Sequence, residues 1–380
     1  MNVRNLILFC LLWTFAYCQS SDDDPVGTDC STRKTHTPGT CQHMDDCPSV
    51  KRGEIPSRDI TYCNRRQGLV CCPNRDQELE PPQDLSIPGQ RISDRKCKEY
   101  RSITQKEFYM GSLILNQKGK VVIQDKCQHK SIGLIVGGTD AYPSEFPHQA
   151  LLGYKPRDNK DTIWVCGGSL VSADHVLTAA HCMNHRETGP VKFVKLGMRR
   201  RLQEDDRVQM FNVDTLHPHP QYNRKTNLND IALIKIKGKV NFNEHLYPIC
   251  LPTTQPENSD VLLTGFGKTG RDHEQAENLM KVVLNKFTYD ECKQLYRNRE
   301  IDRKSMLCYG SRKESKDSCR GDSGGPIQIS NNNDVRCTYK QIGIVSFGAD
   351  NCGTVGFPGI YVNVFNYINW IEGIVWKDEV

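Results

Sequence analysis

The chain has 380 residues, of which 37% are hydrophobic and 25% charged, and its formal net charge is +5. At about 100 to 200 residues per domain, this length predicts two or three domains. The composition excludes a membrane bundle and a highly charged disordered chain, and the charge is too mild to indicate a nucleic-acid binder. The 29 Gly and 19 Pro, with short and broken apolar runs, favour turns and β structure.

The N-terminal residues have the pattern of a secretory signal. Arg4 precedes an apolar run from Leu6 to Phe15, and small residues close the run before a polar stretch begins after Cys18. We therefore expect a signal peptide over residues 1–18 and a secreted, extracellular protein. Without Cys10 and Cys18, 16 of the 18 cysteines remain, an even number that can form up to eight disulfides in an oxidising compartment.

Six cysteines lie within residues 30–72, a segment too short to bury much core, so disulfides must hold it together. Six cysteines allow 15 connectivities, and sequence arithmetic alone selects none of them. A zinc site is the competing interpretation, but His36 and His43 fit no paired-ligand spacing, and we expect no metal. After Cys72 the composition shifts to Pro, Gln, Glu and Arg, which predicts an exposed, largely extended linker over residues 73–134. A short apolar piece at 111–115 is a strand or a loop.

From residue 135 to residue 380 the chain has an all-β pattern, because short apolar runs alternate with Gly, Pro and Asn. The clearest runs are at 150–152, 169–177, 231–236 and 342–347. A helix is expected at the C-terminal end, where four apolar residues recur at three-to-four spacing: Val364, Ile368, Ile371 and Val375.

Three segments of this region carry reactive side chains. His181 lies beside Cys182, Asp230 precedes an apolar run, and Ser323 lies in a glycine-rich segment at 321–326. A Ser hydroxyl is a weak nucleophile, so a neutral imidazole must take its proton, and a carboxylate must fix the imidazole tautomer. These contexts, in the order His, Asp, Ser, resemble the trypsin-like serine proteases over residues 135–380.

The resemblance implies a two-barrel fold, serine endopeptidase activity without a cofactor, and catalytic roles for His181, Asp230 and Ser323. It also implies an oxyanion hole formed by the N–H groups of Gly321 and Ser323. Asp317, six residues before the nucleophile, would lie at the floor of the specificity pocket, where a carboxylate demands Arg or Lys. The other substrate-binding positions that the resemblance implies are Ser346, Gly348 and Gly359.

The segment Ile-Val-Gly-Gly at 135–138 resembles the N-terminus that is created when such zymogens are cut. The freed ammonium of Ile135 would pair with Asp322 and order the site. The residue before the cut is Leu134 rather than Arg or Lys, and an acidic pocket gains nothing from Leu. We therefore expect no self-activation, and an upstream protease of chymotrypsin-like or elastase-like specificity is implied.

The six-cysteine module resembles the clip domain of arthropod serine proteases. Leu134, the linker segment 96–100 and the additional Cys337 resemble the Snake-type group of these enzymes. The resemblance implies an extracellular cascade in Toll signalling, melanization or embryonic patterning, with a downstream clip-domain zymogen as target and a serpin as inhibitor. It implies neither a nucleic-acid nor a membrane partner. The alternatives are a noncatalytic homologue that acts as a binding cofactor, which would usually lack Ser323, and a digestive trypsin, which would lack the clip module.

The resemblance also implies disulfides. In the clip module these are Cys30–Cys71, Cys41–Cys63 and Cys47–Cys72, and in the catalytic domain Cys166–Cys182, Cys292–Cys308 and Cys319–Cys352. Two further bonds would join the remaining cysteines, which are Cys97, Cys127, Cys250 and Cys337. We expect a linker cysteine, Cys127, to pair with Cys250 and to keep the clip module attached after activation.

A basic run lies at residues 199–201. Arg199 to Arg201 could bind a polyanion, although a solvated loop is the favoured interpretation. Calcium is not expected in this loop, because Met198 follows Leu196 and Gly197 where calcium-binding relatives often have Glu.

Overall fold

The computed structural model describes residues 26–32, 38–51, 55–73, 90–110, 120–125, 138–156, 161–268, 274–313, 321–330, 338–348 and 354–379, with the backbone alone for 106–110 and 120–125. The chain forms two compact units, one of residues 1–85 and 106–124, the other of residues 86–105 and 125–380. Within the described ranges, no helix is both long and apolar enough to cross a membrane. The expected signal peptide and the apolar piece at 111–115 lie outside the described residues.

The first unit contains a small antiparallel sheet of strand order β1-β2-β4-β3. Its elements are β1 (Asp29–Ser31), β2 (Pro38–His43), η2 (Met44–Asp46), α1 (Pro48–Lys51), η3 (Ser57–Asp59), β3 (Tyr62–Asn64) and β4 (Leu69–Pro73). Three disulfides cross it, and they are the pairs that the clip resemblance implies: Cys30–Cys71, Cys41–Cys63 and Cys47–Cys72. The bonded cysteines themselves, with Leu69 and Val70, form most of the buried interior, which explains how so short a segment is held. A separate two-stranded sheet joins β5 (Gln105–Met110) and β6 (Lys120–Asp125).

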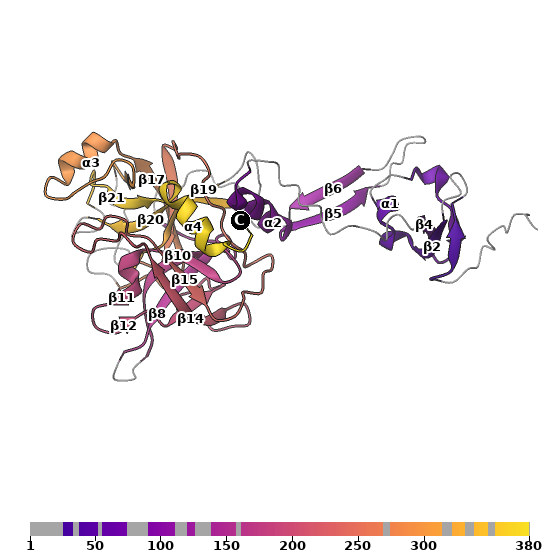
Figure 1. Ribbon diagram of the computed structural model, residues 1–380, viewed down its shortest axis with the longest axis horizontal. Helices are drawn as coiled ribbons and strands as arrows, with labels where there is room; N and C mark the ends of the chain where they lie inside the picture. The colour runs from indigo at the N-terminus through magenta and orange to yellow at the C-terminus, as the bar shows by residue number, and fades with distance from the viewer. Residues whose placement is uncertain are drawn as a thin grey trace, which may run out of the picture. The chain divides into compact units, whose positions relative to one another are not determined.

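In the second unit, six described strands close into a barrel in the order β10-β15-β14-β13-β8-β9. They are β8 (Gln149–Tyr154), β9 (Ile163–Leu170), β10 (His175–Thr178), β13 (Phe193–Leu196), β14 (Gln209–Pro218) and β15 (Ala232–Ile236). The apolar run at 169–177 is thus divided between β9 and β10, because a turn at 171–174 reverses the chain. In Figure 1 the labelled strands β8, β10, β14 and β15 lie together in one lobe of this unit.

A second barrel follows. Strands β16, β19, β20, β21, β18 and β17 are neighbours in that order, a further pairing of β16 with β17 closes the ring, and β7 adds to β17 outside it. The strands are β7 (Thr139–Asp140), β16 (Asp260–Gly265), β17 (Met280–Lys286), β18 (Met306–Gly310), β19 (Pro326–Ser330), β20 (Tyr339–Phe347) and β21 (Gly359–Asn363). Two short strands, β11 (Asn184–His185) and β12 (Gly189–Pro190), form a separate pair. The expected two-barrel β architecture is confirmed.

Helices are few in the described part of this unit. The expected C-terminal helix is present as η6 (Val364–Tyr367) followed by α4 (Ile368–Val375), and its buried face packs on the first hydrophobic core. Helix α3 (Tyr289–Leu295) begins at a capping box in which Thr288 and Glu291 satisfy each other's backbone N–H groups. Helix η5 (Ala180–Met183) follows β10 directly.

The prediction that residues 73–134 are largely extended was wrong for the segment Ile92–Ser102, which forms helix α2. Its polar composition conceals four buried side chains, which are Ile92, Ser93, Cys97 and Tyr100. The Tyr100 hydroxyl donates to Val171 O at 3.0 Å, and its ring packs edge-on against Phe242. Tertiary packing on the catalytic unit therefore stabilises a helix that sequence propensity does not signal.

Candidate active site

A cleft of about 680 Å³ receives side chains from both barrels. His181 and Tyr222 come from the first barrel, whereas Gly321, Ser323 and Ser346 come from the second. The fold therefore brings together residues that are distant in sequence, as the expected catalytic roles require.

His181 is held on η5 at the end of β10 by two features of the first barrel. Its neighbour Cys182 is bonded to Cys166 of β9, and the Tyr154 hydroxyl donates to Cys182 O at 2.6 Å. Tyr154 is almost fully buried, so this contact fixes the turn from beneath. About 29% of the His181 side chain remains exposed, which leaves the ring accessible from the cleft.

Asp230 is completely buried and accepts three hydrogen bonds. The His181 backbone N–H donates to Oδ1 at 2.8 Å, and His181 Nδ1 lies 2.8 Å from Oδ2. Since an ionised carboxylate can only accept, Nδ1 must carry the proton and Nε2 is left free to act as a base. The Ser346 hydroxyl donates to the same Oδ2 atom.

The turn before Asp230 depends on a strained residue. Asn229 has φ of 55°, a left-handed conformation that Asn tolerates better than most residues. Its side chain accepts from the Tyr367 hydroxyl at 2.9 Å and donates to Gln221 O at 3.0 Å. These contacts orient Asp230 toward His181. Neither the role of Asn229 nor the contact of Ser346 with Asp230 was predicted from the sequence, where Ser346 was expected only to bind substrate.

Two opposing effects set the pKa of His181. Burial lowers the pKa, whereas the charge of Asp230 and its hydrogen bond raise it, and the net result is a pKa above the usual 6.5. The raised pKa makes the imidazole a stronger base. It also means that the neutral form needed to accept a proton is lost at a higher pH than for an isolated histidine.

Ser323 lies in a turn that only glycine-rich sequence can form. Gly321 and Gly324 have φ of 104° and 79°. A Cβ on Gly324 would lie 2.2 Å from Thr178 Oγ1 and 2.6 Å from Gly167 O, so the turn can pack against β9 and β10 only without a side chain there. The backbone is further fixed by bonds from Gly167 N to Ser323 O and from Gly324 N to Val345 O.

Asp322 points into the second barrel. Its Oδ1 accepts from Gly267 N at 2.8 Å, and a Cβ on Gly265 or Gly267 would collide with its carboxylate. The chain thus provides a fitted recess for one buried carboxylate. The expected partner, Ile135, lies outside the described residues, as does Leu134.

Of the expected substrate-binding residues, Gly359 is buried at the start of β21, and Gly348 directly follows β20, which carries Ser346. Strands β20 and β21 are paired, so these positions belong to adjacent strands. Asp317, Cys319 and Cys352 lie outside the described residues. Residues that were not predicted also line the cleft, among them Lys268 and Gln275, and Gln275 lies over Gly321.

One disulfide expectation was wrong. Cys250 is bonded to Cys97 of helix α2, not to Cys127, because the buried face of α2 places Cys97 against the catalytic unit. Cys127 and Cys337 lie outside the described residues. The other pairs found in this unit are Cys166–Cys182 and Cys292–Cys308.

The two barrels and the hydrogen-bonded histidine and aspartate of the cleft define a serine endopeptidase of the trypsin class. In agreement, the family model described as Trypsin matches residues 135–371, and the chain belongs to this family. Its relatives include insect clip-domain serine proteases. Serine protease snk of Drosophila melanogaster is 32% identical over 349 residues, covering 89% of this chain and 75% of that protein. Melanization protease 1 of the same species is 29% identical and covers 95% and 93%. Phenoloxidase-activating enzyme 1 of Spodoptera litura is 28% identical and covers 99% and 100%.

Proposed function

We propose that this chain is the zymogen of a secreted endopeptidase that is switched on by cleavage after Leu134 and cuts target proteins after Arg or Lys. The observation that carries the proposal is the mismatch between two positions of the sequence, an acidic Asp317 before the nucleophile and an apolar Leu134 before the activation cut. An enzyme that prefers cations at its own cleavage sites depends on another protease to release it.

In the proposed mechanism, His181 Nε2 takes the proton of Ser323 as the hydroxyl attacks the scissile carbonyl, and later gives it to the leaving amine. The hydrogen bonds at Asp230 support this assignment, since they hold the Nδ1–H tautomer and stabilise the imidazolium. The N–H groups of Gly321 and Ser323 stabilise the oxyanion, and losing one such donor lowers kcat by about 10² to 10³. Water then hydrolyses the acyl-enzyme through the same base.

Activation is proposed to act through Asp322. The recess formed by Gly265 and Gly267 fixes the carboxylate of Asp322, which lies between Gly321 and Ser323 in the sequence. Pairing of the new Ile135 ammonium with Asp322 would stabilise the turn that carries the oxyanion donors. Leu134 makes the switch depend on a protease of chymotrypsin-like or elastase-like preference.

The N-terminal part is proposed to stay with the enzyme after activation. The cut lies between Cys97 and Cys250, so the disulfide between them joins the two resulting chains. Noncovalent contacts reinforce it, since Arg91 forms an ion pair with Glu372 at 2.8 Å and Ser93 Oγ donates to the same carboxylate at 2.7 Å. The clip module of residues 30–72 would therefore travel with the catalytic domain of residues 135–380.

The setting is proposed from the relatives, which bear names such as Melanization protease 1 and Phenoloxidase-activating enzyme 1. On this basis the chain acts in an extracellular cascade of immunity, melanization or patterning, after removal of residues 1–18. Its partners would be an upstream protease, a downstream clip-domain zymogen and a serpin.

The activation proposal is tested with the purified zymogen and a Leu134→Arg variant. Pancreatic elastase or chymotrypsin should cut the wild-type zymogen after Leu134, yield an N-terminus of Ile-Val-Gly-Gly, and raise the hydrolysis of peptides ending in Arg. Only the Leu134→Arg variant should activate itself, and its Ser323→Ala derivative should not. Self-cleavage of the wild-type zymogen after Leu134 would contradict the proposal.

A further inference from the structure

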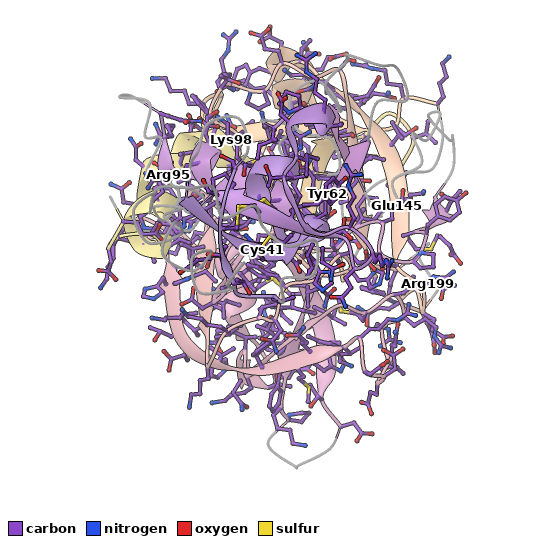
Figure 2. All side chains as sticks on the ribbon, turned by 90° about the vertical axis from the view of Figure 1, so that its right-hand side faces the viewer. Cys41, Tyr62, Arg95, Lys98, Glu145 and Arg199 are labelled. Carbon is purple, nitrogen blue, oxygen red and sulfur yellow. A yellow bond between two sulfur atoms is a disulfide. The ribbon has the colours of Figure 1, made fainter. Side chains whose placement is uncertain are left out.

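A second groove, of about 470 Å³, lies outside the catalytic cleft. Three segments of the catalytic unit and the single residue His245 form it; the segments are the turn at 142–146, the loop at 197–207 and the residues 278–279 that lead into β17. Among the described residues, none that lines this groove also lines the catalytic cleft. In Figure 2, Arg199 and Glu145 are labelled on the same side of the molecule.

Charges are segregated in this groove. Arg199, Arg200 and Arg207 line it and are exposed, and within the described part of the chain none of them forms an ion pair. Among the described residues of the lining, the one carboxylate is that of Glu145, which is 1% exposed and neutralised by Lys281 at 2.8 Å. The acidic residues of the same loop do not line the groove; they are Glu204, Asp205 and Asp206. The surface presented to solvent is therefore cationic.

Hydrogen bonds fix the backbone of the loop that carries the arginines. Gln203 Oε1 accepts from the backbone N–H groups of Arg199 and Arg200 at 2.8 and 3.1 Å, and its Nε2 donates to Asp205 at 2.6 Å. Asp205 in turn accepts from Arg207 N at 3.1 Å. Because these bonds tie the arginine-bearing backbone together, binding an anion would cost less ordering entropy than it would for a free loop.

Exposed apolar side chains lie beside the arginines. Six large hydrophobic residues are exposed in the described part of the chain, and two of them lie on segments that form this groove: Tyr142 and Leu202, which are 50% and 62% exposed. Tyr142 lines the groove, and Leu202 lies within the loop at 197–207. A ligand made only of anionic groups would leave these apolar side chains without a contact, whereas a peptide with both acidic and apolar residues would contact the arginines and the apolar side chains.

We propose that this groove is a docking site for an acidic protein segment that also carries apolar side chains. The site lies apart from the bond that is cut, so it would add affinity for a protein partner without changing the preference for the residue at the cut. The contribution of the site to cleavage rests on the proposed function, whereas the binding of a peptide at the site does not.

Binding is measured with the full-length Ser323→Ala protein, which cannot digest the probe, by fluorescence anisotropy of a labelled 12-residue peptide of alternating Glu or Asp with Phe or Leu. We expect saturable binding that weakens as salt rises. The same peptide with Gln and Asn in place of the acids should bind at least tenfold more weakly. Equal binding of the two peptides, or no binding of either, would overturn the proposal.

Variants then locate the site. Charge reversal by R199E/R200E/R207E should weaken acidic-peptide binding at least tenfold. The control K237E/K239E/R297E changes the net charge equally at exposed positions that do not line the groove, and should change binding less than twofold. The single variants R199A and R207A guard against misfolding of the triple variant. Equal losses in the groove and control variants would refute the assignment.

A third comparison separates a peptide site from a polyanion site. Leu202→Ser should weaken the acidic–apolar peptide several-fold and leave a peptide of Glu and Gly alone unchanged. If a heparin fragment displaced the peptide at lower concentration than the peptide displaced itself, and Leu202→Ser had no effect, the groove would be a polyanion site and the proposal would be wrong.

Discussion

Replacement of Lys281 by Met should strongly destabilise the catalytic unit, because it breaks an ion pair that is almost fully buried. Lys281 Nζ lies 2.8 and 2.9 Å from the two carboxylate oxygens of Glu145, and the two side chains are 4% and 1% exposed. Glu145 Oε2 also accepts from Tyr142 N at 2.8 Å, and Lys281 lies over the Tyr142 ring. The pair thus fastens the turn at 142–146 to β17.

The size of the expected destabilisation follows from the burial of the Lys281–Glu145 pair. At an effective dielectric constant of about 20, two charges 2.8 Å apart attract by roughly 6 kcal/mol, much of which offsets the desolvation of both groups. Removing only the cation leaves the Glu145 charge buried without its partner, and such losses are about 3 to 5 kcal/mol. The pair of Arg312 and Glu291 is a matched control, since it has the same 2.8 Å separation but is 45% and 40% exposed. Arg312→Met should cost about 1 kcal/mol or less.

The assay is urea unfolding of the Ser323→Ala protein, followed by tryptophan fluorescence. All Trp residues beyond residue 18 lie in the catalytic unit, so the fluorescence of a protein that begins after residue 18 reports on that unit. The double variant E145Q/K281M should be less destabilised than Lys281→Met alone, because Gln still accepts from Tyr142 N and no charge is left unpaired. If Lys281→Met lowered the free energy of unfolding no more than Arg312→Met does, the buried pair would contribute no more than the exposed one, and the prediction would be wrong.

Three further predictions concern the active site and stability. Asp230→Asn should lower kcat by about 10⁴-fold and move the acidic midpoint of kcat/KM to lower pH, because the charge that raises the pKa of His181 is lost; a pH profile with an Arg peptide measures both. Ser144→Gly should raise the free energy of unfolding by about 0.5 to 1 kcal/mol in a urea titration. Ser144 has φ of 59° and follows a proline, and a turn position of this kind favours Gly. The Arg312 hydrogen bond and the contacts of the helix cap lower the pKa of Glu291 to about 2. The small contribution of the Glu291 charge to stability is therefore complete above the ordinary pKa of 4.5 and should disappear as the pH falls toward 2. Glu291→Gln should abolish this part of the pH dependence of the free energy of unfolding.

The candidate catalytic residues could be predicted from the sequence because each one lies in a distinctive local context. The contact itself is not local, since His181 and Asp230 are 49 residues apart, and the closed barrel of β10 and β15 is what brings them to 2.8 Å. The contact of Ser346 with Asp230 joins the second barrel to the first, across 116 residues, and no local pattern marks it.

The linker shows where sequence reasoning fails. Cys97 and Cys127 both lie in a polar, proline-containing segment, and spacing gives no reason to prefer either as the partner of Cys250. The choice depends on helix α2, whose buried side chains, Cys97 among them, contact residues that are distant in the sequence. Long-range packing therefore determines both the formation of helix α2 and the pairing of Cys97 with Cys250.

The proposed specificity is measured by cutting the zymogen after Leu134 and profiling a peptide library that varies the residue before the scissile bond. We predict cleavage after Arg and Lys, no cleavage by the Ser323→Ala protein, and loss of the basic preference in Asp317→Ser. Cleavage after apolar residues by the processed wild-type enzyme, or a basic preference that survives Asp317→Ser, would contradict this prediction.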